Sequence, residues 1–447
     1  MTRPRHSLPL LVIVLALVLG TSTTSTPAKE PPSASQAPAG VLGISTRLPA
    51  GTLAWFDPLT LQPLRGRTVG LGYHTGSYAF SENRATLAVS DPCDDAGGTA
   101  SLRFVNARSM RTLGDVRLSS GYDCASTLLW LRPDRLLAVL LDTNGGRSQV
   151  VVVDPTARRV LRHVSLPDAP VFATGSTNDE LVLVLGSSDS FVPAHVVAVD
   201  ADGALRSTVV DDVLVGDVVD QSTQDVHART ILPGLAVEPT GRRVFLVPAS
   251  GPIAQIDLRT LGLSYHRLEQ PSLMQRFFRW LTPAAEAKAI EGPVREARWV
   301  GNGVLAVSGF DYSTVGEGQG QHVVAKPAGV ELVDTGSWHA RMLSSSSSDV
   351  SVGGGLVIAG GGTWDESTQM TSGPGLLGFA LDGSKRWTLH AGEERSLYDS
   401  AGSLGYVWLS QGKMEVVDLA SGTVLATLER NESTNPWPWL LAAQRSG

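Results

Sequence analysis

The chain has 447 residues, a formal net charge of −7 and no basic cluster, so a nucleic-acid partner is not expected. Charged residues make up only 18% of the chain, and the 47 glycines suit a fold with many tight turns.

The first forty residues resemble an export signal followed by a linker. Arg3 and Arg5 precede the apolar run "LLVIVLALVLG", which is shorter than the ~20 residues that span a bilayer. We therefore predict a signal peptide over residues 1–28, with an uncleaved membrane anchor as the alternative. Residues 29–40 are rich in Pro, Ser and Ala and predict a flexible linker. The remaining 41–447 are long enough for two ordinary domains or one large all-β domain.

A short pattern recurs eight times along residues 41–447. It consists of a strand, an Asp or Asn, a polar turn and a second strand, as in "VVVVDPTARRVL" from Val150. The Asp or Asn positions, which we call landmark residues, are Asp57, Asn106, Asp154, Asp200, Asp257, Asp334, Asp382 and Asp418. Their separations are 49, 48, 46, 57, 77, 48 and 36 residues, which is typical of propeller blades.

Two further strand-like runs lie between successive landmark residues, so each repeat predicts four short strands joined by tight turns. The fold class is therefore all-β, and the expected architecture is a single β-propeller domain. The residues before Asp57 and those after Asp418 together have the length of one more repeat. "VLGIST" and "NPWPWLLAA" could pair within one closing blade, which gives eight blades. Seven blades with an appended hairpin is the alternative.

The strand-Asp-turn-strand pattern resembles the YVTN and quinoprotein-type repeats, which are related to PQQ and WD40 propellers, over nearly all of residues 40–447. "GFALDGSKRWTL" also resembles the tryptophan-docking repeat of eight-bladed PQQ propellers, with Trp387 at the expected place. The other seven repeats lack this tryptophan, and the adjacent cysteine pair of the quinone dehydrogenases is absent. The resemblance implies a propeller fold without assigning a cofactor. We predict none, and Ca²⁺ and PQQ remain open alternatives.

The two cysteines, Cys93 and Cys124, predict a disulfide, because an even number in an exported protein favours a bridge. Two buried free thiols are the alternative. If each landmark residue ends the third strand of its blade, both cysteines lie on the face that carries the second-to-third and fourth-to-first connections. We call this the insertion face, and the opposite side the landmark face.

Nearly every long connection falls on the insertion face, where loops on a rigid scaffold commonly bind ligands. Their acidic and aromatic residues could line a funnel for a cation, a sugar or a peptide. The candidate ligand-binding residues are Tyr73, His74, Tyr122, Asp123, Asp225, His227, Asp311, Tyr312, His322, Trp364, Asp365 and Glu366. Further carboxylates of these loops are Asp91, Asp94, Asp95, Asp220 and Glu317. Alternatively, these are solvated residues chosen for turn formation.

One segment, over about residues 271–290, has helical rather than strand periodicity. Phe277 and Trp280 share one stripe, with Phe278 beside it. The segment could be a helix that binds a partner or a membrane surface through these three aromatic residues. The interpretation that we favour is that it folds down over the propeller face and buries this stripe.

The sequence contains no GxSxG, HExxH, P-loop or CxxC motif, and no metal site is expected. We predict an exported monomeric binding or scaffold protein of a bacterial cell envelope. It would recognise a protein or an envelope polymer through the insertion face. The alternative is an enzyme at the central funnel: a lyase, a hydrolase or a quinone-linked oxidoreductase. That activity would require a convergent set of His, Arg and carboxylate groups at the ring centre. A third reading is a sensor or assembly scaffold that uses the 271–290 helix.

Overall fold

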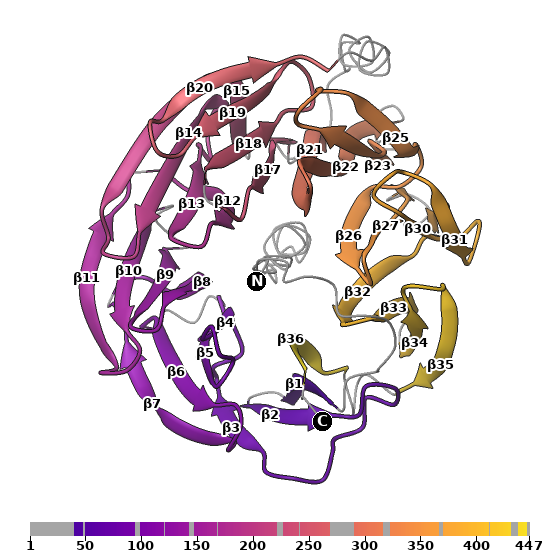
Figure 1. Cartoon of the computed structure of the whole chain (residues 1–447). Helices are drawn as coiled ribbons and strands as arrows, with labels where there is room; N and C mark the ends of the chain where they lie inside the picture. Colours follow the sequence, from indigo (N-terminus) through magenta and orange to yellow (C-terminus); the bar gives the residue numbers. More distant parts are fainter. Residues whose placement is uncertain are drawn as a thin grey trace, which may run out of the picture.

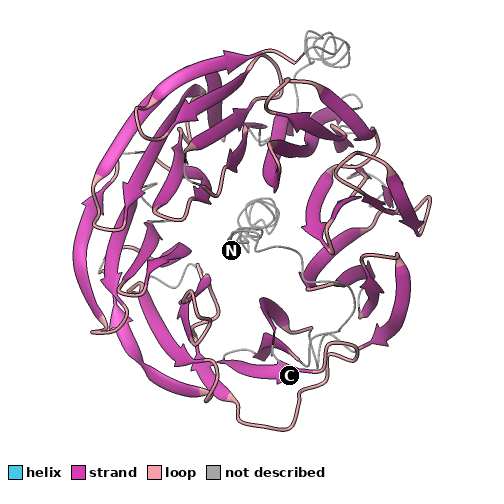
Figure 2. Ribbon diagram, viewed as in Figure 1, coloured by secondary structure: helices cyan, strands magenta, loops and turns pink. Residues whose placement is uncertain are grey.

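The computed structural model describes residues 40–47, 50–93, 99–119, 121–142, 147–167, 169–220, 227–240, 242–268, 290–315, 322–365, 370–410, 412–430 and 437–444. Within these ranges the chain forms 36 strands and no helix (Figure 2). No helix in them is long and apolar enough to cross a membrane. The predicted signal peptide lies outside the described residues, as do the helix candidates Phe277, Phe278 and Trp280.

Six sheets contain four strands each, and neighbouring strands are antiparallel. The first contains β3 (Val69–Gly72), β2 (Ala50–Phe56), β1 (Val41–Arg47) and β36 (Trp439–Gln444). The second contains β4 (Tyr78–Phe80), β5 (Thr86–Ser90), β6 (Ser101–Asn106) and β7 (Arg111–Arg117). The third contains β8 (Cys124–Arg132), β9 (Arg135–Leu141), β10 (Ser148–Asp154) and β11 (Arg159–Ser165).

The other three sheets follow the same plan. One contains β17 (Gly234–Val237), β18 (Arg243–Val247), β19 (Ile253–Asp257) and β20 (Gly262–His266). The next contains β26 (Asp349–Gly353), β27 (Leu356–Gly360), β30 (Leu376–Phe379) and β31 (Lys385–Leu389). The last contains β32 (Ser396–Ala401), β33 (Leu404–Ser410), β34 (Lys413–Asp418) and β35 (Thr423–Glu429).

A twelve-stranded sheet completes the described structure. Its first five strands are β12 (Val171–Ser176), β13 (Glu180–Leu185), β14 (Val192–Asp200), β15 (Leu205–Asp220) and β16 (His227–Ile231). It continues through β21 (Ile290–Gly301), β22 (Val304–Val315), β23 (His322–Pro327), β28 (Thr363–Asp365) and β29 (Met370–Ser372). A branch from β22 adds β24 (Val330–Asp334) and β25 (Ala340–Ser344).

The small sheets are arranged radially around a common centre, as in a β-propeller (Figure 1). Strands such as β4, β8, β26 and β32 lie near the centre, and β7, β11, β31 and β35 lie at the periphery. This arrangement explains the valine run of β10. Val151 and Val153 pack toward β4–β7, whereas Val150 and Val152 pack toward β12–β14. Because both faces of the strand are covered, all four side chains are at most 1% exposed.

The landmark residues have a structural role in the turns that follow the third strands. In the turn after β10, Asp154 Oδ1 accepts the backbone N–H groups of Thr156 at 2.9 Å and Ala157 at 2.8 Å. The other seven landmark side chains also accept nearby backbone N–H groups. Each repeat therefore carries Asp or Asn because a short side-chain acceptor stabilises the turn.

Side chains in or directly after outer strands join one sheet to the landmark turn of the next. The Trp387 indole N–H donates to the Leu419 carbonyl at 2.9 Å. Arginine side chains donate to turn carbonyls at four other junctions. These pairs are Arg162 with Asp202, Arg206 with Leu258, Arg341 with Asp382, and Arg430 with Leu61. At these four junctions an arginine N–H, rather than a tryptophan N–H, donates to the turn carbonyl of the next sheet.

The two ends of the described chain meet in one sheet, as the closing-blade expectation requires. β36 pairs antiparallel with β1, with Ile44 opposite Trp439 and Gly43 opposite Leu440. The Tyr406 hydroxyl of β33 also donates to the Pro58 carbonyl at 3.0 Å, which joins the last sheet to the first.

Three connections expected to be loops are instead largely strands. β15 continues to Asp220 and returns as β16, β22 continues to Val315 and returns as β23, and β28 pairs with β29. β16 runs parallel to the start of β21, and β23 pairs with β28. We call this assembly the rim sheet: 216–220, β16, 290–294, 310–315, β23, β28 and β29. Backbone hydrogen bonds thus link insertions from three separate parts of the chain.

Candidate functional site

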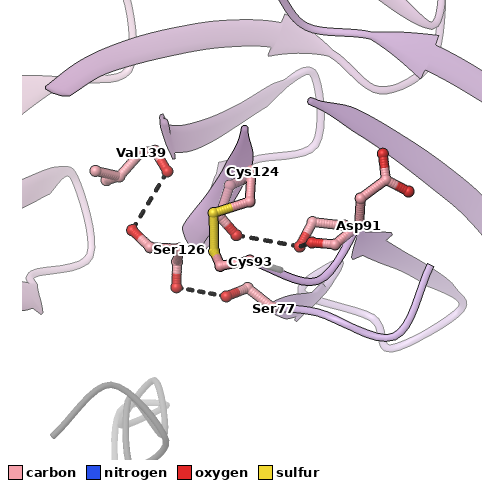
Figure 3. Close-up of a disulfide and its surroundings, with 8 residues drawn as sticks. Ser77, Asp91, Cys93, Cys124, Ser126 and Val139 are labelled. Carbon is pink, nitrogen blue, oxygen red and sulfur yellow. Dashed lines mark hydrogen bonds between the residues drawn. A yellow bond between two sulfur atoms is a disulfide. The ribbon is translucent and has the colours of Figure 1, made fainter. Parts of the chain in front are cut away.

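The disulfide predicted from the sequence is present (Figure 3). Cys93, in the connection after β5, is bonded to Cys124, the first residue of β8, with a Cα–Cα distance of 5.0 Å. Ser77 and Ser90 reinforce this junction by donating to the carbonyls of Ser126 and Ala125, the latter at 3.1 Å. Two connections of the insertion face, the one between β3 and β4 and the one after β5, are therefore tied to β8.

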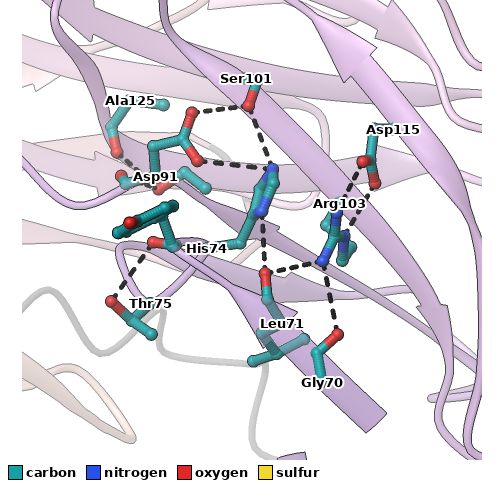
Figure 4. Close-up of polar contacts among 11 residues, drawn as sticks. Gly70, Leu71, His74, Thr75, Asp91, Ser101, Arg103, Asp115 and Ala125 are labelled. Carbon is teal, nitrogen blue, oxygen red and sulfur yellow. Dashed lines mark hydrogen bonds and ion pairs between the residues drawn. The ribbon is translucent and has the colours of Figure 1, made fainter. Parts of the chain in front are cut away.

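His74 lies in a compact polar cluster that includes Asp91, two residues before Cys93 (Figure 4). The residue is 9% exposed, and Nδ1 lies 3.0 Å from the Leu71 carbonyl, which identifies Nδ1 as the N–H donor. Nε2 lies 3.0 Å from Ser101 Oγ and 3.4 Å from Asp91 Oδ1. Ser101 Oγ donates to Asp91 Oδ2 at 2.6 Å.

The combination of Ser101, His74 and Asp91 differs from a catalytic triad. In a triad, the carboxylate accepts from the imidazole nitrogen that faces away from the serine. Here Asp91 contacts the serine and the same nitrogen, Nε2, while a backbone carbonyl occupies Nδ1. The cluster is arranged to fasten the turn after β3 to the connection after β5.

Arg103 supports the same turn from the other side. Its guanidinium donates to the Leu71 carbonyl at 2.8 Å and to Asp115 at 2.9 and 2.7 Å. The hydrogen bond from Arg103 lowers the pKa of the Asp115 carboxyl. The turn is thus held by two side-chain systems, yet Tyr73 within it is 68% exposed.

Tyr122 and Asp123 belong to this same region of the insertion face. The Tyr122 carbonyl accepts from the Ala100 N–H at 3.2 Å, and its ring packs against the apolar cluster around β6 and β8. The Asp123 N–H donates to the Leu141 carbonyl at 2.9 Å. The structure therefore brings Tyr73, His74, Tyr122 and Asp123 to one region.

The rim sheet brings together candidates from two other insertions. Ala325 of β23 pairs with Trp364 of β28, and Val324 pairs with Asp365. His322 Nε2 lies 3.5 Å from Asp365 Oδ1. These contacts join segments that the sequence gives no reason to place side by side.

Asp311 and Tyr312 do not form one site, because they are adjacent in β22 and adjacent strand residues point to opposite faces. Asp311 Oδ1 accepts from Arg295, a buried arginine 5% exposed, at 2.6 Å. Tyr312 packs against the apolar cluster formed by β13–β15 and β17–β19, and burial raises the pKa of its phenol.

The structure describes only the backbone of His227 and does not describe five other candidates. The His227 backbone pairs with Asp220 in the β15–β16 ladder. The other members of the predicted set, Asp94, Asp95, Asp225, Glu317 and Glu366, lie outside the described residues.

A second polar group, near the ring centre, was not found from the sequence. Glu296 and Arg298 of β21 lie with 3.7 Å between Oε2 and Nη2, and Ser308 of β22 lies opposite Glu296. Asp349 of β26 is hydrogen-bonded to Ser396 of β32. Burial raises the pKa of both the Glu296 and Asp349 carboxyls, and the Asp349 charge adds to the effect on Glu296.

Asp399, also on β32, is a third perturbed carboxyl close to the ring centre. Burial raises its pKa to about 7, although a hydrogen bond from the Ser400 N–H acts in the opposite direction. Burial and the Asp399 charge also raise the pKa of Tyr78 on β4. In the described ranges, no group of three or more His, Cys, Asp or Glu side chains is arranged to hold a metal ion.

No protein-family model and no curated protein matches the chain. Among solved structures, dihydro-heme d1 dehydrogenase NirN in complex with DHE has 10% identity and a TM-score of 0.50, covering 93% of this chain and 78% of that one. AztD from Citrobacter koseri has 11% identity, covers 90% of this chain and 96% of its own, and gives a TM-score of 0.47. BamB from Moraxella catarrhalis has 13% identity, respective coverages of 88% and 92%, and a TM-score of 0.42. The similarity to NirN, at 10% identity and a TM-score of 0.50, concerns the fold alone. The chain has the β-propeller fold.

Proposed function

We propose that this chain is an exported binding or scaffold propeller that recognises a protein or a cell-envelope polymer through its insertion face. One observation carries the proposal: the insertions of this face are braced against each other. The rim sheet links three of them by backbone pairing, and the disulfide and the His74 cluster fasten another group. A surface ordered before binding loses less conformational entropy when a partner arrives.

The turn that contains Tyr73 is the best-defined contact point on this surface. Aromatic side chains that are held rigidly commonly act as anchors in protein interfaces. Tyr73 is 68% exposed, while its neighbours His74 and Leu71 are fixed by hydrogen bonds. On the landmark face, by contrast, the landmark side chains are hydrogen-bonded within their own turns.

We interpret the ring as eight blades. Six are the separate four-stranded sheets, and the twelve-stranded sheet contributes two more. These are β12–β15 and the group of β21, β22, β24 and β25, which are joined through the rim sheet. The disulfide supports an oxidising compartment outside the cytoplasm, in keeping with the expected signal peptide.

An enzyme acting at the ring centre is the second candidate. The observation that favours it is the Arg298, Glu296 and Asp349 group, because perturbed carboxyl pKa values are common in active sites. This group contains an arginine and two carboxyls but no histidine. It therefore lacks one member of the combination of His, Arg and carboxylate that such an enzyme is expected to have.

Site-specific photo-crosslinking in the native producer tests the proposed binding face. A photoreactive residue replaces Tyr73 in one variant and Leu59 in a matched control. Leu59 is 38% exposed and lies in the landmark turn after β2. We expect one dominant crosslinked partner from position 73 and none from position 59. Equal crosslinking from both positions, or from position 59 alone, would contradict the proposal.

A further inference from the structure

Two neighbouring strands at the periphery of the ring, β7 and β11, carry a surface that is both basic and apolar (Figure 1). Leu113 and Leu161 lie on these strands and are 39% and 38% exposed. The exposed basic side chains on the two strands and directly before β11 are Arg111, Arg117, Arg158, Arg159 and Arg162. We call the two leucines and five arginines the basic edge. Since the whole chain has a net charge of −7, this concentration of arginine is local.

Each leucine of the basic edge is the extra residue of a β-bulge. The pairing of β6 with β7 skips Leu113, and the pairing of β10 with β11 skips Leu161, so neither leucine has a residue opposite it. A bulge changes the direction in which a side chain points, and it also protects the free edge of an outer strand from pairing with another chain. The basic edge therefore favours recognition by side chains over the addition of a further strand.

Arg158 holds the two outer strands together. It lies in the landmark turn before β11, and its guanidinium donates to the Leu113 carbonyl of β7. The same side chain packs against Gly114, where a Cβ atom would lie 3.2 Å from Arg158 Cδ. Gly114 also has a φ of 142°, a conformation that favours glycine. The bulges of β7 and β11 are thus fixed beside each other, and their side chains belong to one surface.

The positive charge of the basic edge is not neutralised by neighbouring carboxylates. In the described part of the chain, none of its five arginines forms an ion pair. The nearby carboxylates have other partners, because Asp115 pairs with Arg103 at 2.7 Å and Asp202 pairs with Arg135 at 3.3 Å. An anionic partner is therefore the electrostatic complement of this surface.

The mixture of arginine and exposed leucine indicates that this partner is an anionic lipid surface. Guanidinium groups bind phosphate through charge-assisted hydrogen bonds, and leucine side chains enter the boundary between headgroups and acyl chains. A folded acidic protein would have to match arginines that are spread over two strands. Lipid headgroups diffuse to each arginine independently, so they require no such match.

We propose that the basic edge docks the propeller on a bilayer that contains anionic phospholipids. The arginines bind lipid phosphates, and Leu113 and Leu161 enter the headgroup region. This surface lies on the perimeter of the ring, whereas the proposed partner binds the insertion face. Membrane docking therefore does not depend on the proposed function and does not require the insertion face to be covered.

Vesicle flotation of the full protein, isolated from its native producer, tests the proposal. We expect binding to vesicles of phosphatidylcholine with phosphatidylglycerol, but not to phosphatidylcholine alone. Raising the salt from about 0.1 M to about 1 M should release the protein, because the Debye length falls from roughly 10 Å to roughly 3 Å. Binding that does not respond to phosphatidylglycerol would overturn the proposal. Binding of poly-glutamate without binding of vesicles would also overturn it and would assign the surface to an acidic protein.

Two double variants test the role of the arginines. Arg111→Gln with Arg159→Gln removes two charges from the basic edge. Lys385→Gln with Arg386→Gln is the matched control, because it removes two exposed charges from β31, another outer strand. We expect the first to weaken vesicle binding roughly 25-fold, at roughly fivefold for each basic residue near an anionic surface, and the control to bind like the wild type. Equal weakening in both, or in neither, would contradict docking through this edge.

Three serine variants test the insertion of the leucines. We expect Leu113→Ser and Leu161→Ser each to weaken vesicle binding about threefold, because a partly exposed leucine loses its burial in the headgroup region. Leu425→Ser is the control: Leu425 is 47% exposed and is likewise skipped in the pairing of β34 with β35. Its vesicle binding should equal that of the wild type. Unchanged binding in all three variants, or equal weakening in all three, would overturn the insertion of these leucines.

Discussion

Replacing Asp399 by asparagine is expected to stabilise the protein at alkaline pH. Asp399 lies on the inner strand β32, and burial raises its pKa from 3.8 to about 7. Asparagine has nearly the same shape and keeps an oxygen that can accept the Ser400 N–H, now 2.7 Å from Asp399 Oδ1. The substitution therefore removes the charge and preserves the local hydrogen bond.

The size and sign of the effect follow from the two pKa values. Between pH 4 and pH 7 the unfolded chain has released the Asp399 proton, while the folded protein still holds it. Raising the pH through this window therefore lowers the free energy of unfolding of the wild type. The difference between 3.8 and about 7 corresponds to at most about 4 kcal/mol, and the loss is complete above pH 7.

Urea denaturation of wild type and Asp399→Asn at pH 4, 6 and 8, followed by tryptophan fluorescence, measures this effect. We expect the two proteins to be equal within about 1 kcal/mol at pH 4 and the variant to be more stable at pH 8. A difference that does not change with pH, or a variant less stable at pH 8, would refute the reasoning.

Asp334→Asn provides a comparison of opposite sign. Hydrogen bonds from Ser337 lower the pKa of Asp334, so its contribution to stability is present above pH 3.8. That contribution is lost as the pH falls through the folded-state pKa. We expect this variant to be less stable than the wild type at pH 7, with the difference shrinking in acid.

Substitutions at three sites test the structural contacts by urea denaturation at pH 7. Trp387→Phe removes the N–H that donates to Leu419 and should cost about 1 kcal/mol, whereas Trp387→Ala should cost roughly 2–4 kcal/mol because packing is also lost. A Trp387→Phe variant as stable as the wild type would argue against the hydrogen bond. Asp154→Ala removes the acceptor for two backbone N–H groups and should cost about 1–2 kcal/mol, and an unchanged midpoint would show that the turn does not need it. Replacing Cys93 and Cys124 by serine opens a loop of sequence separation 31 and should cost about 3–4 kcal/mol, so a neutral result would contradict the bracing attributed to the bridge.

Features with a local physical cause could be predicted from the sequence. Asp154 and its equivalents are recognisable because an Asx turn needs its acceptor within three residues of the donors. The valine run of β10 likewise indicates a strand covered on both faces. The Cys93–Cys124 disulfide could be predicted because both cysteines lie in loops that the repeat pattern assigns to the same face.

Features that depend on register between distant strands could not be predicted. The sequence of the "FDYSTV" segment predicts part of a loop, in which Asp311 and Tyr312 could form one site. Once the segment is a strand, the two side chains must point in opposite directions. Glu296 and Ser308 lie opposite each other only through the pairing of β21 with β22. The tryptophan-docking pattern likewise does not identify Arg206, which reaches the same kind of turn carbonyl.

The most direct test of insertion-face binding is hydrogen–deuterium exchange of the chain alone and bound to the partner crosslinked from position 73. The account predicts slower exchange in the turn 70–76 and in the rim-sheet segments 310–315 and 322–327. Exchange in the landmark turns, such as 154–159 and 334–338, should remain unchanged. Slower exchange confined to those landmark turns would contradict the account.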